Sequence, residues 1–230
     1  MAMVQVPSDL VQKVEAYVEE YMSHYDASHD YNHIKRVLGL AHIIMTKEEE
    51  RRAAVALQKG IDPGTNNTAY FNSTLVTLGA LLHDVGDKKY LQPGEDATTL
   101  VRDVLLRKNC PVTLATRVQE LVVSVSFSSE IKDPQRALEQ IERIPELAIV
   151  QDADRLDAIG AVGIGRCFAF TGAKNKSKVG LGSAIDHFEE KLVLLEDMMK
   201  TETGKLLARQ RTERLRAFMG WWADEHDMLA

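Results

Sequence analysis

The sequence predicts an all-α protein that folds as a compact helical bundle. Apolar residues recur at helical spacing in most segments, no stretch shows a convincing strand pattern, and no internal repeat is present. The chain has 230 residues, of which 45% are hydrophobic and 27% charged, so it is long enough to bury a substantial core. We therefore expect a single domain over residues 1–230.

The first half of the chain shows five helical segments. Apolar positions three and four residues apart mark them over about residues 10–21, 33–44, 73–84, 97–105 and 114–125. Polar stretches rich in glycine and proline predict loops at residues 60–67 and 90–96. Gly86 is expected to end the third helix, because glycine commonly follows the last helical turn.

The second half is less regular. Residues 126–134 are polar and turn-prone, whereas residues 144–170 are largely apolar but interrupted by glycines, which lower helix propensity. Lysine and serine dominate residues 172–182, which predicts a mobile loop. Residues 183–226 predict two long helices that are broken near Gly204.

Composition excludes several classes of function. The net charge of −6 provides no basic field for nucleic acid, and no apolar run reaches the roughly 18 residues that a membrane span needs. Cys110 and Cys167 do not have a metal-type spacing and are expected to be reduced thiols. No signal-peptide pattern is found near Met1, so we expect a cytoplasmic protein, with a nuclear location left open.

The adjacent pair His83-Asp84 is the most informative feature of the sequence. An imidazole and a carboxylate that follow an apolar helical segment can both reach one divalent ion. His33 lies on an earlier predicted helix and Asp154 on a later one, so the four residues make a plausible set of two nitrogen and two oxygen ligands. Asp152 competes with Asp154 as the fourth ligand.

At these residues the chain resembles the HD-domain superfamily of metal-dependent phosphohydrolases, whose H…HD…D pattern they match in order. The flanking residues 29–33, 81–88, 151–161 and 187–192 are similar to a compact single-domain subgroup that includes bacterial nucleotide pyrophosphohydrolases. The resemblance implies an HD-type helical bundle with a metal core at about residues 28–170. The C-terminal helices, at about residues 183–227, would pack on that core.

The resemblance also implies the metal site. In the family pattern the aspartate precedes an arginine, as Asp154 precedes Arg155, which assigns the ligands to His33, His83, Asp84 and Asp154. The segment between Asp84 and Asp154 contains no histidine, whereas family members with two metals have further histidine ligands there, so we expect one ion. Two imidazoles and two carboxylates suit a transition metal, with Mn²⁺ preferred and Fe²⁺, Co²⁺, Ni²⁺ or Zn²⁺ as alternatives.

Two further residues are candidates for catalysis. Asp87 lies three residues after Asp84 and is expected to orient the attacking water or to act as general base, although it also fits a simple helix-end residue. Lys88 is placed to hold a phosphate, or it is a solvated lysine favoured by the helix C-terminus.

Five other residues are predicted substrate contacts. His29, Arg36 and Asp157 lie three or four residues from a predicted ligand, so each shares a helix face with it. His29 and Asp157 also suit a role in orienting the ligands, and Arg36 is expected to reach a phosphate or Asp154. His187 and Lys191 form an i, i+4 pair in the late segment and are expected at the substrate entrance, or else as buried hydrogen-bonding residues.

The expected activity is hydrolysis of a small phosphorylated substrate, most specifically a nucleoside triphosphate to a monophosphate and pyrophosphate. The alternatives are a 5′-nucleotidase or another phosphomonoesterase, and a non-catalytic nucleotide-binding module. The intact ligand set favours an enzyme over the binding module. The expected partner is the substrate alone, with no nucleic acid and no membrane, in a monomer or a homodimer.

Overall fold

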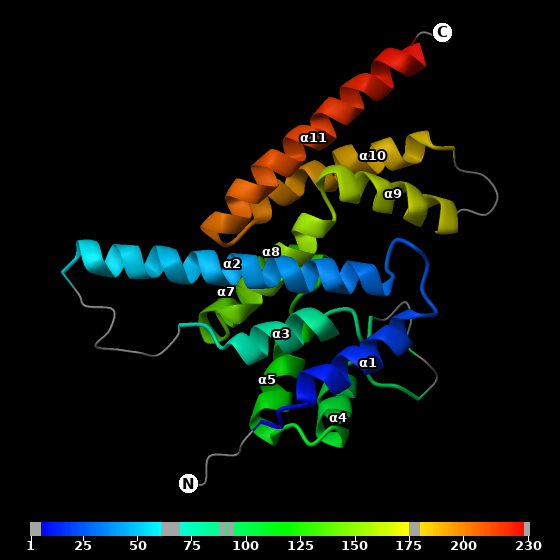
Figure 1. Cartoon of the computed structure of the whole chain (residues 1–230). Coiled ribbons are helices and arrows are strands. Elements are labelled where there is room, and N and C mark those ends of the chain that lie inside the picture. The colour runs from blue at the N-terminus through cyan, green and yellow to red at the C-terminus, as the bar shows by residue number, and fades with distance from the viewer. Residues whose placement is uncertain (1–5, 61–69, 88–90, 92–93, 175–179, 228–230) are drawn as a thin grey trace.

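The computed structural model describes residues 6–60, 70–87, 91, 94–174 and 180–227 (Figure 1). These residues form eleven α-helices, one 3-10 helix and no strand, which confirms the all-α prediction. In chain order the elements are α1 (Leu10–Met22), α2 (Tyr31–Gln58), α3 (Ser73–Leu82), α4 (Leu100–Arg107), α5 (Val112–Val122), α6 (Phe127–Lys132), α7 (Pro134–Arg143), α8 (Glu146–Asp157), α9 (Gly160–Lys174), α10 (Gly182–Glu190), η1 (Leu192–Met198) and α11 (Glu202–Asp227).

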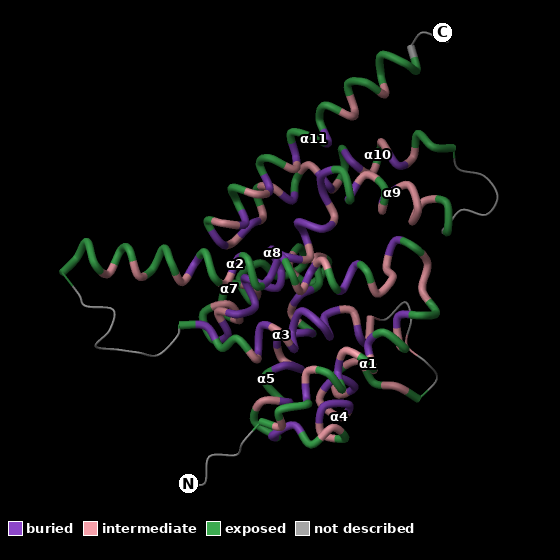
Figure 2. Tube along the Cα trace, in the orientation of Figure 1, coloured by how far each residue is buried: buried purple, intermediate pink, exposed green. Residues whose placement is uncertain are grey.

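The long helix α2 crosses the middle of the molecule and packs against α8 and α3 (Figure 1). Helices α1, α3, α4 and α5 lie on one side of it, and α9, α10 and α11 lie on the other. Two hydrophobic clusters fill these two sides, and α2 and α8 supply buried residues to both. Figure 2 shows the buried positions concentrated where these two helices meet the rest of the bundle. The two helices that carry His33 and Asp154 are thus the central framework of the fold.

Side-chain caps place the beginnings of two helices that lead to the predicted ligands. The Asp30 carboxylate accepts a hydrogen bond from the backbone N–H of His33 at 3.1 Å, which puts His33 in the first turn of α2. The Asn72 side chain accepts one from Leu75 N–H at 3.0 Å at the start of α3. Helix α3 ends at Leu82, earlier than the predicted end at Gly86, and His83-Asp84 lie in the turn that follows it. Gly86 lies at the end of this turn, with a φ of +87° that is readily adopted only by glycine.

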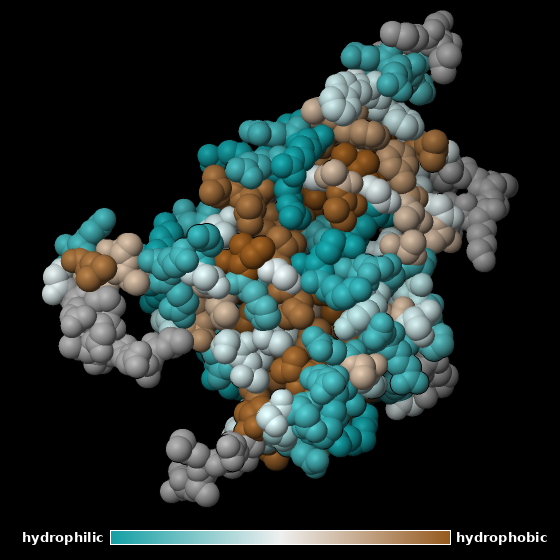
Figure 3. All heavy atoms as spheres, viewed as in Figure 1, coloured by the Kyte–Doolittle hydropathy of each residue, from teal (hydrophilic) through white to brown (hydrophobic). Residues whose placement is uncertain are grey.

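Hydrophobic side chains gather over α9, α10 and α11 on the face shown in Figure 3. Val162, Leu181, Leu206 and Trp221 are exposed on these helices or next to them. No single helix in the described part of the chain is both long and apolar enough to cross a membrane. Helices α8 and α9, joined through a 71° bend, meet the length and composition criteria only as a pair.

The polar segment 126–134, predicted to be turn-prone, contains the short helix α6 and the N-terminal residue of α7. Distant partners explain this difference. The carboxylate of Glu130 accepts hydrogen bonds from Arg155 on α8 and from Lys200, at 2.6 Å, before α11. Because these contacts are made by residues far away in the sequence, local turn propensity did not reveal them.

The predicted break near Gly204 is in the wrong place. The chain turns at Met199–Thr201, and Gly204 lies in the first turns of α11. Asp152 on α8 produces the break, since its carboxylate accepts from the backbone N–H groups of Lys200 and Thr201. A Cβ at Gly204 would lie 2.3 Å from an oxygen of that carboxylate, so this glycine permits close approach rather than ending a helix.

The segment before this break is a short α10 followed by η1, not the single long helix that was predicted. The expected loop at 172–182 begins later than predicted, because α9 continues to Lys174. Residues 175–179 of that loop lie outside the described residues, as do residues 61–67 of the loop predicted at 60–67 and residues 90, 92 and 93 of the loop predicted at 90–96.

Candidate metal centre and substrate pocket

The structure brings the four predicted metal ligands together from α2, the end of α3, and α8. His33 Nε2 lies 3.1 Å from His83 Nε2, 3.3 Å from Asp84 Oδ2 and 3.6 Å from Asp154 Oδ1. His83 Nε2 lies 3.5 Å from the same Asp84 oxygen and 3.7 Å from the same Asp154 oxygen. Donor atoms that share one divalent ion at about 2.1 Å lie about 3.0–3.4 Å apart, which is close to these separations.

Hydrogen bonds to the outer nitrogens set the tautomers of both imidazoles. His33 Nδ1 lies 2.8 Å from Asp157 Oδ2, and His83 Nδ1 lies 2.8 Å from the carbonyl oxygen of Ala80. A carboxylate and a carbonyl can only accept, so each Nδ1 carries the proton and donates it. In the neutral rings the Nε2 lone pairs then point at each other and at the two aspartates, which is the form that binds a metal.

This arrangement fits a divalent cation. When both rings are neutral, two lone pairs 3.1 Å apart repel each other unless a metal ion or a shared proton lies between them. Asp84 Oδ2 is buried and accepts no hydrogen bond from any described residue, although buried carboxylate oxygens are normally paired. His33, His83 and Asp84 together form a group that could hold a metal ion, and Asp154 borders it.

The electrostatics of the centre favour a bound cation. Burial by itself would lower the pKa of His83, but the charges of Asp84 and Asp154 raise it to about 9. Burial likewise opposes ionisation of Asp84, yet the nearby His83 and His33 hold the pKa of that carboxyl far below its usual value. The pKa of Asp154 is lowered in the same way, so the metal-free centre keeps two carboxylates and attracts positive charge.

Asp157 lies behind His33 rather than at an exposed edge of the site. Its side chain is only 1% exposed and accepts hydrogen bonds from Arg36 Nε at 2.7 Å, Arg36 Nη2 at 3.0 Å and Arg166 Nη1 at 3.2 Å, besides the bond from His33. Against the effect of burial, these cationic and donor groups hold the pKa of Asp157 well below its usual value. The orienting role considered for Asp157 therefore has a direct geometric basis, and Arg36 contacts Asp157 instead of Asp154.

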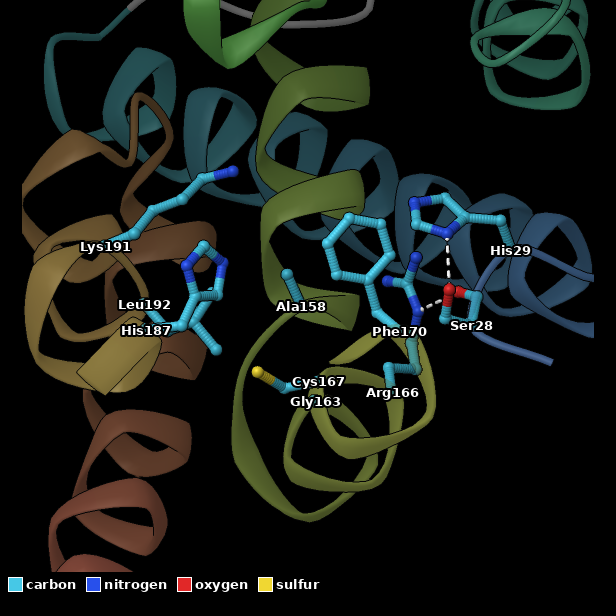
Figure 4. A pocket seen from close by; sticks show the side chains of 10 residues that line it. All are labelled: Ser28, His29, Ala158, Gly163, Arg166, Cys167, Phe170, His187, Lys191 and Leu192. Atoms are coloured by element: carbon cyan, nitrogen blue, oxygen red, sulfur yellow. Dashed lines mark hydrogen bonds between the residues drawn. The ribbon is translucent and has the colours of Figure 1, made fainter. Parts of the chain in front are cut away.

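A pocket open to solvent lies beside this centre (Figure 4), with about 550 Å³ of empty space that includes the open solvent at its mouth. It is lined by three predicted substrate contacts, His29, His187 and Lys191, and by Arg166. The rest of the lining is Ser28, Ala158, Gly163, Cys167, Phe170 and Leu192. The lining contains two histidines, an arginine and a lysine but no carboxylate. Together with its apolar side chains, this suits an anion with an apolar portion.

His29 joins the pocket to the centre. Its ring centroid lies 6.0 Å from that of His33 and 5.8 Å from that of Phe170. Its Nδ1 lies 2.7 Å from Ser28 Oγ, and the Asp26 carboxylate in turn accepts from the backbone N–H of Ser28 at 2.8 Å. Burial lowers the pKa of His29 despite the raising effect of Asp84, so the ring is neutral at pH 7.

The remaining predicted residues are only partly placed. Asp87 is half-buried after the turn that follows α3, and its backbone N–H bonds to the carbonyl oxygen of Asp84 at 3.3 Å. Lys88 lies outside the described residues. Asp152, the rival for the fourth ligand position, accepts hydrogen bonds from the backbone N–H groups of Lys200 and Thr201 just before α11 and takes no part in the centre. The catalytic roles of Asp87 and Lys88 stay predictions.

Arg166 is the residue that sequence analysis missed. It lies on α9 in the glycine-interrupted segment, where attention fell on the glycines. One signal was present, because Arg166 is the sole charged residue between Ala158 and Phe170 in an otherwise apolar stretch. An isolated charge in such a stretch is costly to bury without a partner and therefore indicates a specific contact.

A helical bundle whose His, His-Asp and Asp residues converge beside a basic pocket has the characteristics of a metal-dependent phosphohydrolase. The model of the HD domain matches residues 30–159, which is more than half of the chain. The protein belongs to the HD-domain family of metal-dependent phosphohydrolases, as its sequence motifs predicted.

Similar proteins span nearly the whole chain. YpgQ of Bacillus subtilis is 33% identical over 201 residues, covering 87% of this chain and 85% of YpgQ. Its crystal structure in complex with ADP superposes with a TM-score of 0.65 at 27% identity, covering 94% of this chain and 95% of that chain. The crystal structure of a Lactobacillus plantarum protein superposes with a TM-score of 0.71 at 26% identity, covering 97% of this chain and 100% of that chain. The crystal structure of an HD-superfamily hydrolase from Bacillus thuringiensis superposes with a TM-score of 0.61 at 26% identity, covering 94% of this chain and 96% of that chain.

Proposed function

We propose that this protein hydrolyses a nucleoside triphosphate to a monophosphate and pyrophosphate at the centre formed by His33, His83, Asp84 and Asp154. The observation that carries the proposal is the position of this centre beside a pocket that is lined by basic side chains and by no carboxylate. The centre also contains a buried Asp84 oxygen that accepts no hydrogen bond from any described residue. The similar protein YpgQ has been crystallised with ADP, which supports a nucleotide as the ligand class.

The four ligands would hold one divalent transition metal, preferably Mn²⁺. Such an ion, when bound, activates a water and polarises a phosphoryl oxygen. Asp157 fixes the His33 ring so that its Nε2 faces the centre, and the Ala80 carbonyl does the same for His83. Asp87 stays our candidate for accepting the proton of the attacking water, and Lys88 our candidate for holding a phosphate.

The pocket would receive the nucleotide. Phe170 and the neutral ring of His29 form an aromatic surface near the centre, on which a planar base or a sugar can pack. Figure 4 shows His187 and Lys191 on the opposite wall of the pocket. Their basic nitrogens would contact phosphate groups that extend away from the centre.

Product analysis tests the proposal. The purified protein is incubated with Mn²⁺ and a panel of nucleoside mono- and triphosphates, and products are identified by mass spectrometry. We expect pyrophosphate and a monophosphate from wild type, and none from Asp84→Ala. Asp224→Ala is the matched control, because Asp224 is exposed near the far end of α11 and should leave activity unchanged.

Other products would identify the alternatives. Orthophosphate released from monophosphates would make the protein a 5′-nucleotidase or another phosphomonoesterase. Tight nucleotide binding with no turnover would make it a non-catalytic binding module. Either result would refute pyrophosphohydrolysis.

A further inference from the structure

We propose that Arg166 is a substrate-binding residue that holds a phosphate group of the substrate next to the metal centre. The inference rests on the proposed function, because it requires a phosphorylated substrate in the pocket. Arg166 lies outside residues 30–159, which the model of the HD domain matches, and its assignment rests on geometry.

The guanidinium of Arg166 is fixed at two of its three nitrogens. Nε donates to the carbonyl oxygen of Ser28 at 2.7 Å, and Nη1 donates to Asp157 Oδ2 at 3.2 Å. Nη2 makes no hydrogen bond to any residue that the structure describes, although Arg166 lines the pocket and its side chain is only 12% exposed. Figure 4 shows the group on the same wall of the pocket as His29 and Phe170. A held guanidinium with an unused donor edge in a pocket is preorganised for an anion.

Asp157 alone does not explain the presence of Arg166. The carboxylate already has Arg36, which donates two hydrogen bonds at 2.7 and 3.0 Å, and it accepts a third bond from His33. Arg166 adds a single and longer bond. Arg36 does not line the pocket, so of the two guanidiniums on Asp157, Arg166 is the one that a ligand in the pocket can contact.

Through Asp157, Arg166 links the pocket to a predicted metal ligand. Asp157 Oδ2 accepts from both His33 Nδ1 and Arg166 Nη1, so one oxygen atom separates the guanidinium from a ring that faces the centre. A nucleotide that extends from the pocket to the centre would therefore bring a phosphate group near this fixed positive charge. The fork of a guanidinium can bond to oxygens of such a group, and its charge offsets the negative charge that the group carries.

Variants of the two arginines that bond to Asp157 test the assignment. Arg166→Gln and Arg36→Gln each remove one guanidinium from Asp157, but only the first removes a donor from the pocket. The probe is α,β-methylene-ATP, in which the bond between the first two phosphates cannot hydrolyse. Its Kd is measured by calorimetry with Mn²⁺-loaded protein, together with the Kd for Mn²⁺ alone and with KM and kcat on ATP.

We expect Arg166→Gln to weaken binding of the probe about 10–100-fold and to raise KM similarly, since a charge-assisted hydrogen bond is lost. Arg166→Lys, which keeps the charge without the fork, should recover part of the affinity. We expect Arg36→Gln to lower kcat through Asp157 while changing the Kd of the probe by less than about threefold, because it removes no donor from the pocket. If Arg166→Gln binds as wild type does, or if both Gln variants weaken binding equally, the assignment is overturned.

The experiment separates this inference from the proposed function. If wild type binds the probe tightly and only Arg166→Gln fails to do so, Arg166 is a substrate-binding residue even when ATP is not turned over. If all variants hydrolyse ATP with an unchanged KM, the proposed function stands and the role of Arg166 is refuted. Should Arg166→Gln fail to fold, Arg166→Lys provides the comparison, and wild-type affinity in that variant would refute a need for the guanidinium fork.

Discussion

Replacing Asp157 with asparagine should weaken both the metal centre and the fold. The side chain keeps its shape but loses its charge, and only one of its two terminal atoms can still accept hydrogen bonds. In wild type the two carboxylate oxygens accept from His33, Arg36 and Arg166 while almost completely buried. The amide in Asp157→Asn would therefore leave the His33 ring without a reliable acceptor and Arg166 without its carboxylate.

Two magnitudes follow from these contacts. Partners that orient a metal ligand are typically worth about 10–100-fold in metal affinity, so the Kd for Mn²⁺ should rise about that much. Breaking a buried ion pair costs about 3–5 kcal/mol, and we expect about 3 because Arg36 is 36% exposed and can turn to solvent. For a chain of this size that corresponds to a fall of about 6–12 °C in the Tm of the metal-free protein.

Calorimetric titration with Mn²⁺ and thermal unfolding in a chelator measure the two effects separately. Asp224→Asn, at an exposed position on α11, is the matched control and should behave as wild type does. Thermal unfolding of wild type and Asp157→Asn at acid pH provides a further check. The lowered pKa of Asp157 means that its stabilising contribution is present above the unfolded pKa and lost as pH falls through the folded value. Unchanged Mn²⁺ affinity in Asp157→Asn would refute the orienting role.

Two further outcomes are expected. The pKa of His83, about 9 without metal against 6.5 ordinarily, predicts a contribution to the stability of the metal-free protein that is fully present below about pH 6.5 and lost as pH rises through about 9. Tm measured from about pH 6 to 10 should therefore fall in chelator more steeply than with Mn²⁺, and parallel curves would count against this assignment. Gly204→Ala should destabilise the protein by at least about 2 kcal/mol because its Cβ would meet the Asp152 carboxylate, whereas Gly220→Ala, with open space around it, should stabilise α11 by up to about 1 kcal/mol. Urea unfolding compares the two, and equal effects would show that the contact at Gly204 does not matter.

The sequence predicted where the four candidate ligands lie on their helices, because that placement is local. Asp30 caps α2 within three residues of His33, and Gly86 ends the turn that follows His83-Asp84. Short-range rules of this kind depend only on neighbouring residues. The helices that these rules define then needed only to pack together for the ligands to converge.

Contacts between distant segments account for what could not be predicted. Helix α6 is stabilised by contacts of Glu130 with Arg155 and Lys200, and the break before α11 is made by Asp152. Arg166 reaches Asp157 and Ser28 only after the chain has turned at Gly160, whose φ is +74°. Periodicity within a segment carries no information about partners that lie elsewhere in the chain.

The charged side chains of α8 fall on two faces of the helix and make two separate sets of contacts. Asp154 and Asp157 are three residues apart on one face, where Asp154 borders the centre and Asp157 bonds to the outer nitrogen of His33. Asp152 and Arg155, also three apart, lie on another face and bond to the segments around η1 and α11. Both pairs are largely buried, so α8 cannot shift toward one set of partners without straining the other. Contacts with the segments around η1 and α11 thus fix the position and rotation of α8, the helix that supplies Asp154. No described residue of α11 itself belongs to the centre.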